Sequence, residues 1–185
     1  MAEIKKTSAV RNAPKHLLGI QNLSISEAKD ILNEAKSFIK LNRSNSKKLA
    51  TLRGKTQINL FFEPSTRTLI SFEIAAKRLG ADVVNMNIQG SSLRKGETLF
   101  DTAQTIGAMN PDLVIIRHNE DNSAEKISNL LNCPVINAGE GVNEHPTQAL
   151  LDAFTILSHK KTLKDLTVSI CGDLEHSRVA RSNYY

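Results

Sequence analysis

Short apolar runs alternate along this chain with longer stretches in which apolar residues recur every three or four positions. The short runs predict buried strands, and the longer stretches predict helices with one apolar face. Ser24 and Glu27 form a capping box that marks the start of the first helix. We expect helices at 24–41, 66–79, 97–109, 123–131 and 147–157, and strands at 56–62, 82–86, 113–116, 134–137 and 167–171.

This order of strands and helices predicts an α/β fold in which a parallel sheet has helices on both faces. We expect three segments: a leader at 1–16, a main domain at 17–158, and, at 159–185, the first strand and the helix start of a second α/β domain. Ligands of such sheets bind at the carboxyl ends of the strands. The loops that follow the strands are therefore the places where we expect chemistry.

The turn after the first strand combines several features of a phosphate site. Ser65, Thr66, Arg67 and Thr68 open the helix at 66–79. A helix N-terminus offers unpaired backbone N–H groups and the positive end of the helix dipole, to which these side chains add hydroxyls and a guanidinium. Ser65 could instead act only as a helix cap. A cap does not need Arg67 and two threonines, so we favour the phosphate site.

Cations follow the second and third strands. The loop that holds Ser91 and Lys95 is, by its residues alone, more typical of a solvated turn before a helix. Arg117 directly follows four apolar strand residues. A charge in that position needs an anion, which is either a ligand or a nearby Asp or Glu.

Polar side chains also follow the fourth and fifth strands. His145 and Gln148 are three residues apart at a helix entrance, so they can converge on one small polar ligand, although a lone His in such a place is usually part of the cap region. Arg178 follows the fifth strand, and a surface Arg at a helix start is an equally good interpretation. All of these groups fall on one edge of the expected sheet, which a purely structural domain would not need.

Charge and composition exclude several classes of protein. The net charge of +5 is concentrated near the N-terminus, where residues 1–55 carry 12 Lys and Arg against 4 Asp and Glu. These cations are scattered and lack interleaved aromatic residues, so we predict a solvated face and no nucleic-acid partner. No stretch resembles a signal peptide or a membrane span, which predicts a cytoplasmic protein. We interpret Cys133 and Cys171 as buried thiols, and no spacing suggests a metal or another cofactor.

Four motifs carry a resemblance to a known family. The run Phe-x-Glu-x-Ser-Thr-Arg-Thr at 61–68 resembles the carbamoyl-phosphate loop of the aspartate and ornithine carbamoyltransferases. The loop at 91–98 and the run at 137–152 are similar to aspartate enzymes rather than ornithine enzymes, and Lys95 is the main discriminator. Residues 172–178 resemble the start of the family's aspartate-binding domain, so the resemblance extends from about residue 17 to residue 183.

The resemblance implies transfer of the carbamoyl group of carbamoyl phosphate to the amine of L-aspartate. The products are N-carbamoyl-L-aspartate and phosphate, in an early step of pyrimidine synthesis without a cofactor. It also implies a homotrimer with shared active sites, with or without regulatory chains. By this resemblance Ser65, Thr66, Arg67 and Thr68 hold the phosphate; Thr68, Arg117 and His145 face the carbonyl oxygen; Gln148 holds the carbamoyl NH₂; Ser91 and Lys95 come from the neighbouring subunit; and Arg178 binds an aspartate carboxylate.

The sequence departs from the family in two ways. Leu69 stands where the family usually has Arg, and we expect this to change local packing or affinity rather than chemistry. The chain also stops at Tyr185, early in the second domain. We therefore expect an incomplete and poorly active chain that exposes Val168 and Ile170. The alternatives are an enzyme similar to ornithine carbamoyltransferases, or an inactive remnant that binds carbamoyl phosphate or has a structural role.

Overall fold

The computed structural model of the protein describes residues 13–87 and 98–185. Its central feature is a sheet of four strands: β1 (Thr56–Phe61), β2 (Asp82–Asn87), β3 (Leu113–His118) and β4 (Val135–Glu140). The strands lie in the order β2-β1-β3-β4, and every neighbouring pair is parallel. The predicted parallel α/β fold is confirmed. Six helices surround the sheet: α1 (Ile25–Arg43), α2 (Thr66–Leu79), α3 (Leu99–Ala108), α4 (Ser123–Leu130), α5 (Pro146–Lys160) and α6 (Arg178–Tyr184).

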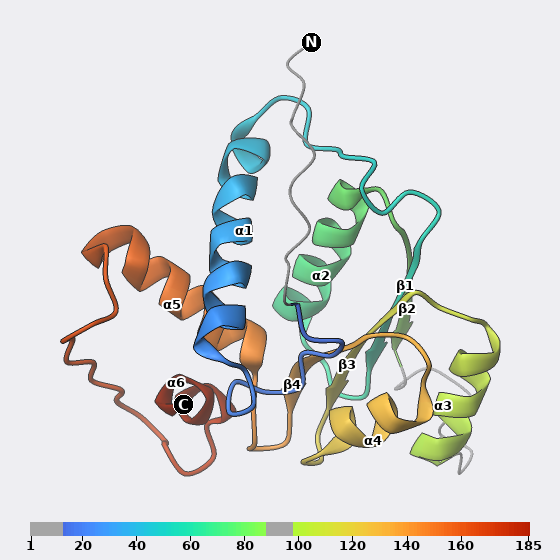
Figure 1. Ribbon diagram of the computed structural model, residues 1–185. Coiled ribbons are helices and arrows are strands. Elements are labelled where there is room, and N and C mark those ends of the chain that lie inside the picture. The colour runs from blue at the N-terminus through green and yellow to red at the C-terminus, as the bar shows by residue number, and fades with distance from the viewer. Residues whose placement is uncertain (1–12, 88–97) are drawn as a thin grey trace.

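Helices cover both faces of the sheet, and each face has its own apolar core (Figure 1). On one face, Ile106 of α3 and Ile127 of α4 pack against strand residues such as Ile116, and all three side chains are fully buried. On the other face, Leu69 and Phe72 of α2 pack against the buried Phe61 and Ile115. Leu69 thus contributes to local packing.

The first strand and the helix after it form as the sequence predicts. β1 lies between two other strands, and five of its six residues are buried, as expected for a central strand of a parallel sheet. Two of the buried residues are polar, and Gln57 Nε2 donates to Oδ1 of Asn59 at 2.8 Å. α2 has the predicted bounds and ends at Gly80, whose φ of 92° lies in the left-handed region that glycine adopts without strain. The predicted capping box at Ser24 is also present.

The predicted strand at 167–171 is wrong, because these residues have no ladder partner in the part of the chain that the structure describes. The outer edge of β4 is already occupied. The N–H of Leu17 donates to the carbonyl of Val135 at 2.9 Å, and the N–H of Asn137 donates to the carbonyl of Leu17 at 2.9 Å. A strand needs such partners for its backbone groups, so 167–171 remains irregular.

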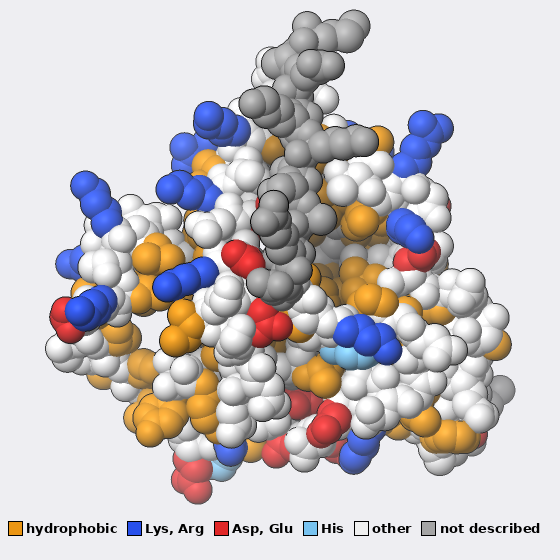
Figure 2. Space-filling view, in the orientation of Figure 1, with side chains coloured by type: hydrophobic (Ala, Val, Ile, Leu, Met, Phe, Trp, Pro, Cys, Tyr) orange, Lys and Arg blue, Asp and Glu red, His pale blue; other side chains and the backbone are white. Residues whose placement is uncertain are grey.

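Two consequences concern the surface of this irregular segment. Val168 is 61% exposed and Ile170 is 42% exposed, as expected for an apolar pair without a cover. Cys171 is also exposed, so the prediction that both cysteines are buried holds only for Cys133. In Figure 2 apolar surface is visible at the lower left, where Figure 1 places the C-terminal segment.

The charged surface shows no single concentration on the face in view. Figure 2 shows the Lys and Arg side chains spread over much of this face. Among the described residues, no helix combines the length and hydropathy that a membrane span requires. The division of the chain into a leader and two domains stays a prediction.

Candidate functional site

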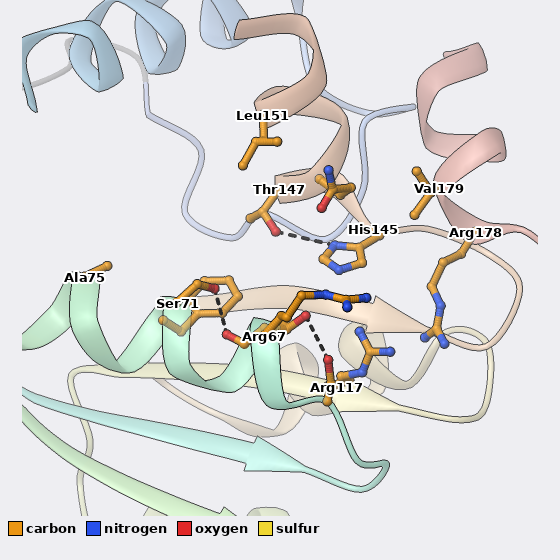
Figure 3. Close-up of a pocket in the computed structure, with 13 residues that line it drawn as sticks. Arg67, Ser71, Ala75, Arg117, His145, Thr147, Leu151, Arg178 and Val179 are labelled. Carbon is orange, nitrogen blue, oxygen red and sulfur yellow. Dashed lines mark hydrogen bonds between the residues drawn. The ribbon is translucent and has the colours of Figure 1, made fainter. Parts of the chain in front are cut away.

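A cleft of about 570 Å³ lies at the carboxyl edge of the sheet (Figure 3). The first turns of α2 form one wall, the end of β3 lies at its base, and α5 and α6 close the other side. Seven predicted site residues meet here. They are Ser65, Arg67, Thr68, Arg117, His145, Gln148 and, from α6, Arg178.

The N-terminus of α2 faces this cleft without a side-chain cap. Ser65 occupies the cap position with extended backbone angles (φ −157°, ψ 91°), but its side chain accepts no capping hydrogen bond. Its hydroxyl instead donates to the hydroxyl of Thr68 at 2.9 Å. The interpretation of Ser65 as a simple cap is therefore wrong. Thr66 is exposed and is not among the residues that line the cleft.

Two arginines share one carboxylate at the base of the cleft. Nη2 of Arg117 lies 2.6 Å from Oε1 of Glu63, and Nη2 of Arg178 lies 2.8 Å from the same oxygen. Arg117 Nη1 also donates to the carbonyl of Ala138 at 3.0 Å. The pairing of Arg117 with a nearby acidic residue, left open by the sequence, is thus present. Two positive groups nevertheless face one negative group, so the base of the cleft keeps an excess of positive charge.

Part of the hydrogen-bonding capacity of these guanidinium groups is unused. Nε of Arg117 and Nη1 of Arg178 are buried and have no partner among the described residues. A buried donor without a partner costs about 1–3 kcal/mol, and more when it is charged. An anion in the cleft that accepted these two bonds would recover this cost. The geometry therefore favours an anionic ligand.

Gly139 on β4 leaves the space that the two guanidinium groups occupy. A Cβ atom at this position would lie 2.8 Å from Nη1 of Arg117 and 3.2 Å from Nη1 of Arg178. Its φ of 110° is also one that glycine adopts readily and other residues rarely do. Glycine is therefore needed here for the backbone conformation and for the close approach of the arginines.

The ring of His145 lies above these two arginines (Figure 3). His145 is the cap residue of α5, and Pro146 follows at the first helical position. Burial, and then the charges of Arg117 and Arg178, lower the pKa of His145 to about 4. The imidazole is therefore neutral at pH 7 and carries one donor and one acceptor nitrogen. Its Nδ1 lies 3.5 Å from the hydroxyl of Thr147.

Gln148 follows on the first turn of α5 and lines the same cleft. Its Nε2 donates to Oδ1 of Asp152 at 3.0 Å. This bond fixes the orientation of the amide, and its carbonyl oxygen accepts no hydrogen bond from the described residues. The free oxygen can accept a bond from an N–H group of a ligand.

Two residues at the cleft were not predicted from the sequence, and two of the predicted site residues lie outside the described part of the chain. Glu63 and Thr147 had no predicted role, although Glu63 follows β1 at the edge where the cations gather. His118 is buried, stacks near Phe62 with ring centroids 4.4 Å apart, and is not among the residues of the cleft. Ser91 and Lys95 lie outside the described residues. No group of three or more potential metal ligands is found within 13–87 and 98–185.

Fold and cleft together define an α/β protein with a cationic cleft at the carboxyl edge of its parallel sheet. A family model described as "Aspartate/ornithine carbamoyltransferase, carbamoyl-P binding domain" matches residues 15–158. The chain therefore belongs to the aspartate/ornithine carbamoyltransferase family.

Individual relatives agree with this assignment. The chain is 60% identical to the aspartate carbamoyltransferase catalytic subunit of Pelagibacter ubique, over 98% of this chain and 58% of the relative. It is 56% identical to that of Rhodopseudomonas palustris, over 92% of this chain and 54% of the relative. A structure of aspartate transcarbamoylase from Trypanosoma cruzi, in complex with carbamoyl phosphate and aspartate, is 35% identical with a TM-score of 0.85, over 92% of this chain and 53% of that one. The chain thus spans about half the length of these relatives.

Gly139→Ala should weaken anion binding, because the added methyl group would displace the guanidinium of Arg117. Gly54→Ala is the matched control, since Gly54 has a φ of 77° and nothing lies within 4 Å of the position of its Cβ. Both variants should lose roughly 1–2 kcal/mol of stability through backbone strain. Only Gly139→Ala should lose affinity for inorganic phosphate, by about tenfold or more, in calorimetry at low salt. Equal affinities in the two variants would contradict the close packing of Arg117 against this backbone.

The stability of the protein should depend on pH through His145. Its folded pKa of about 4 is below the ordinary value of 6.5, so between these values the unfolded chain binds a proton that the folded chain does not. Stability should therefore fall as the pH falls through this window. From pH 7 to pH 5 this group should account for about 2 kcal/mol, which His145→Asn should abolish. Urea unfolding of both proteins at both pH values measures the difference, and equal pH dependence would contradict the lowered pKa.

Proposed function

We propose that this chain is the carbamoyl-phosphate-binding part of an aspartate carbamoyltransferase. The observation that carries the proposal is the meeting of Arg67, Arg117 and Arg178 at the uncapped N-terminus of α2. The reaction transfers the carbamoyl group of carbamoyl phosphate to the amine of L-aspartate, and it gives N-carbamoyl-L-aspartate and phosphate. The proposal includes a role in pyrimidine synthesis and a cytoplasmic location.

The phosphate would lie against the first turn of α2. Backbone N–H groups and the positive end of the helix dipole meet there, and the hydroxyls of Ser65 and Thr68 already lie 2.9 Å apart. Arg67 would add a charge-assisted contact from the same turn. We retain Thr66 in this role through its backbone, because its side chain does not line the cleft.

The carbamoyl carbonyl would lie between the phosphate and His145. Arg117 has a buried, unpaired Nε, and the neutral ring of His145 can donate one hydrogen bond. Together with the hydroxyl of Thr68 they would stabilise the negative charge that develops on the carbonyl oxygen. The free carbonyl oxygen of Gln148 would hold the carbamoyl NH₂ group.

The protein needs no nucleophile of its own for this reaction, because carbamoyl phosphate is a mixed anhydride and is already activated. The amine nitrogen of aspartate bonds to the carbonyl carbon, and the bond from that carbon to the phosphate oxygen breaks. The phosphate leaves with the electron pair and accepts the amine proton. Arg178 would hold an aspartate carboxylate beside the carbonyl carbon, so the contribution of the protein is orientation and charge stabilisation.

Aspartate is favoured over ornithine as the second substrate. The relatives described above are named aspartate carbamoyltransferases or transcarbamoylases. The cationic base of the cleft also suits a dicarboxylate better than a substrate that carries a side-chain amine. The remaining alternative is a chain that binds carbamoyl phosphate without turnover. Because the chain spans about half of its relatives, the first test of the proposal is binding.

Arg67→Ala should weaken the binding of carbamoyl phosphate to this chain. It removes a charge-assisted contact worth roughly 1.5–3 kcal/mol, so the affinity should fall about tenfold to a hundredfold. Arg78→Ala is the matched control, since Arg78 lies in the last turn of the same helix and bonds to Asn42. Calorimetry with all three proteins decides the matter. A wild-type chain without measurable affinity, or equal losses in the two variants, would contradict the proposed site.

The complete enzyme should be a homotrimer with shared sites, with or without regulatory chains. In this proposal Ser91 and Lys95 reach the cleft of the neighbouring subunit. Lys95→Ala and Arg117→Ala trimers should each be nearly inactive, and hybrid trimers should regain activity because each contains a site with neither substitution. Mixing the two purified variants of the complete enzyme and assaying carbamoyl aspartate tests this. Verified hybrids that remain inactive would rule out sharing of these residues.

A further inference from the structure

Glu144, which precedes His145, is a buried carboxylate outside the cleft. It is 5% exposed and is not among the residues that line the candidate site. Burial of a charged group is costly unless hydrogen bonds compensate it. Glu144 therefore needs an explanation that the proposed chemistry does not supply.

All the polar groups that contact this carboxylate are donors. The N–H of Ile20 donates to Oε2 at 2.6 Å, and the N–H of Gln21 donates to Oε1 at 3.3 Å. The hydroxyl of Ser182 donates to Oε2 at 3.2 Å. A carboxylate is the side chain that only accepts, so its chemistry matches this environment. Gly19 lies against the carboxylate so closely that a Cβ there would fall far inside van der Waals contact with Oε1.

Ser182 connects this carboxylate to the candidate site. Its hydroxyl oxygen accepts the backbone N–H of His145 at 2.7 Å, and the residue is 1% exposed. A hydroxyl that donates to a carboxylate and accepts from an N–H has its direction fixed by both partners. Ser182 belongs to α6, the helix that begins with Arg178. One chain of hydrogen bonds thus joins the two elements that bring His145 and Arg178 into the cleft.

We propose that Glu144 is a positioning residue. Through Ser182 it fixes the position of His145 relative to α6, the helix that carries Arg178, and its other hydrogen bonds connect both to the segment at 19–21. Neither Glu144 nor Ser182 touches the cleft. Their contribution is to fix the backbone of His145 at the entrance of α5 and to keep α6 against it. The importance of this positioning for catalysis rests on the proposed function, in which His145 faces the carbonyl oxygen of carbamoyl phosphate.

The titration of His145 reports this positioning without any substrate. Burial lowers its pKa first, and the charges of Arg117 and Arg178 lower it further, while Asp152 acts in the opposite direction. If Ser182 no longer holds the backbone of His145, water reaches the ring and Arg178 moves away. Both changes raise the pKa. His118 provides an internal reference, because its pKa is lowered mainly by burial and neither Ser182 nor Arg178 is among the groups that act on it.

The experiment follows both histidine rings by NMR titration of the chain. In Ser182→Ala and Glu144→Ala the pKa of His145 should rise from about 4 toward 6.5, while that of His118 stays constant. Glu144→Gln keeps an acceptor oxygen for Ser182 and should leave His145 near its original value. Asn183→Ala is the matched control on α6, since it removes the bond from Asn183 to Asp152 but not the one through Ser182. It should leave His145 unchanged.

Three results would overturn the proposal. The first is an unchanged His145 in folded Ser182→Ala. The second is a common shift of His145 and His118, or the same shift in Asn183→Ala, which would indicate general loosening. The third is failure of both Ser182→Ala and Glu144→Ala to fold, because the contact would then serve the fold as a whole. The binding of carbamoyl phosphate by the wild-type chain is measured separately, so failure of the proposed function would be recognised independently.

Discussion

The cleft depends on one electrostatic arrangement, in which a single carboxylate lies between two guanidinium groups. Glu63 follows β1, Arg117 lies at the end of β3 and Arg178 begins α6, so residues far apart in the sequence meet at one oxygen atom. The side chains are largely shielded from solvent, with exposures of 13–22%. One carboxylate cannot neutralise two guanidinium groups, and burial keeps water from screening the remaining charge. The fold holds this excess of charge in place because parallel strands end together at one edge of the sheet.

Much of this fold could be predicted because its signals are local. Pro64 and Gly80 bracket α2, and apolar runs mark the four strands that form. The convergence of Arg67, Arg117 and His145 also followed from the sequence, since each lies at or just after the carboxyl end of a strand of one parallel sheet. The specific role of each residue came from the resemblance of the motifs to a family. Residue spacing alone would not supply these roles.

The remaining features depend on contacts that no local pattern reveals. Val168 and Ile170 have the alternation of a strand, but Leu17 already pairs with the outer edge of β4. The pairing of Glu63 with two arginines brings together residues more than 50 positions apart. Ser182 reads as an ordinary helix residue until α6 is placed against the loop that contains His145. Each of these features depends on contacts between segments that are distant in the sequence, so it cannot be predicted from a window of a few residues.

Burial, together with the positive charge of the cleft, determines the protonation state of His145. Burial disfavours an imidazolium at this position, and the positive charges of Arg117 and Arg178 disfavour it further, so the pKa of His145 falls and the ring stays neutral. Arginine keeps its proton throughout the accessible pH range, whereas a neutral imidazole offers one donor and one acceptor. The arginines and the histidine of the cleft therefore have two different roles. Permanent charge on the arginines serves to attract an anion, and a neutral, directional ring above them serves to contact a polar group that carries no full charge.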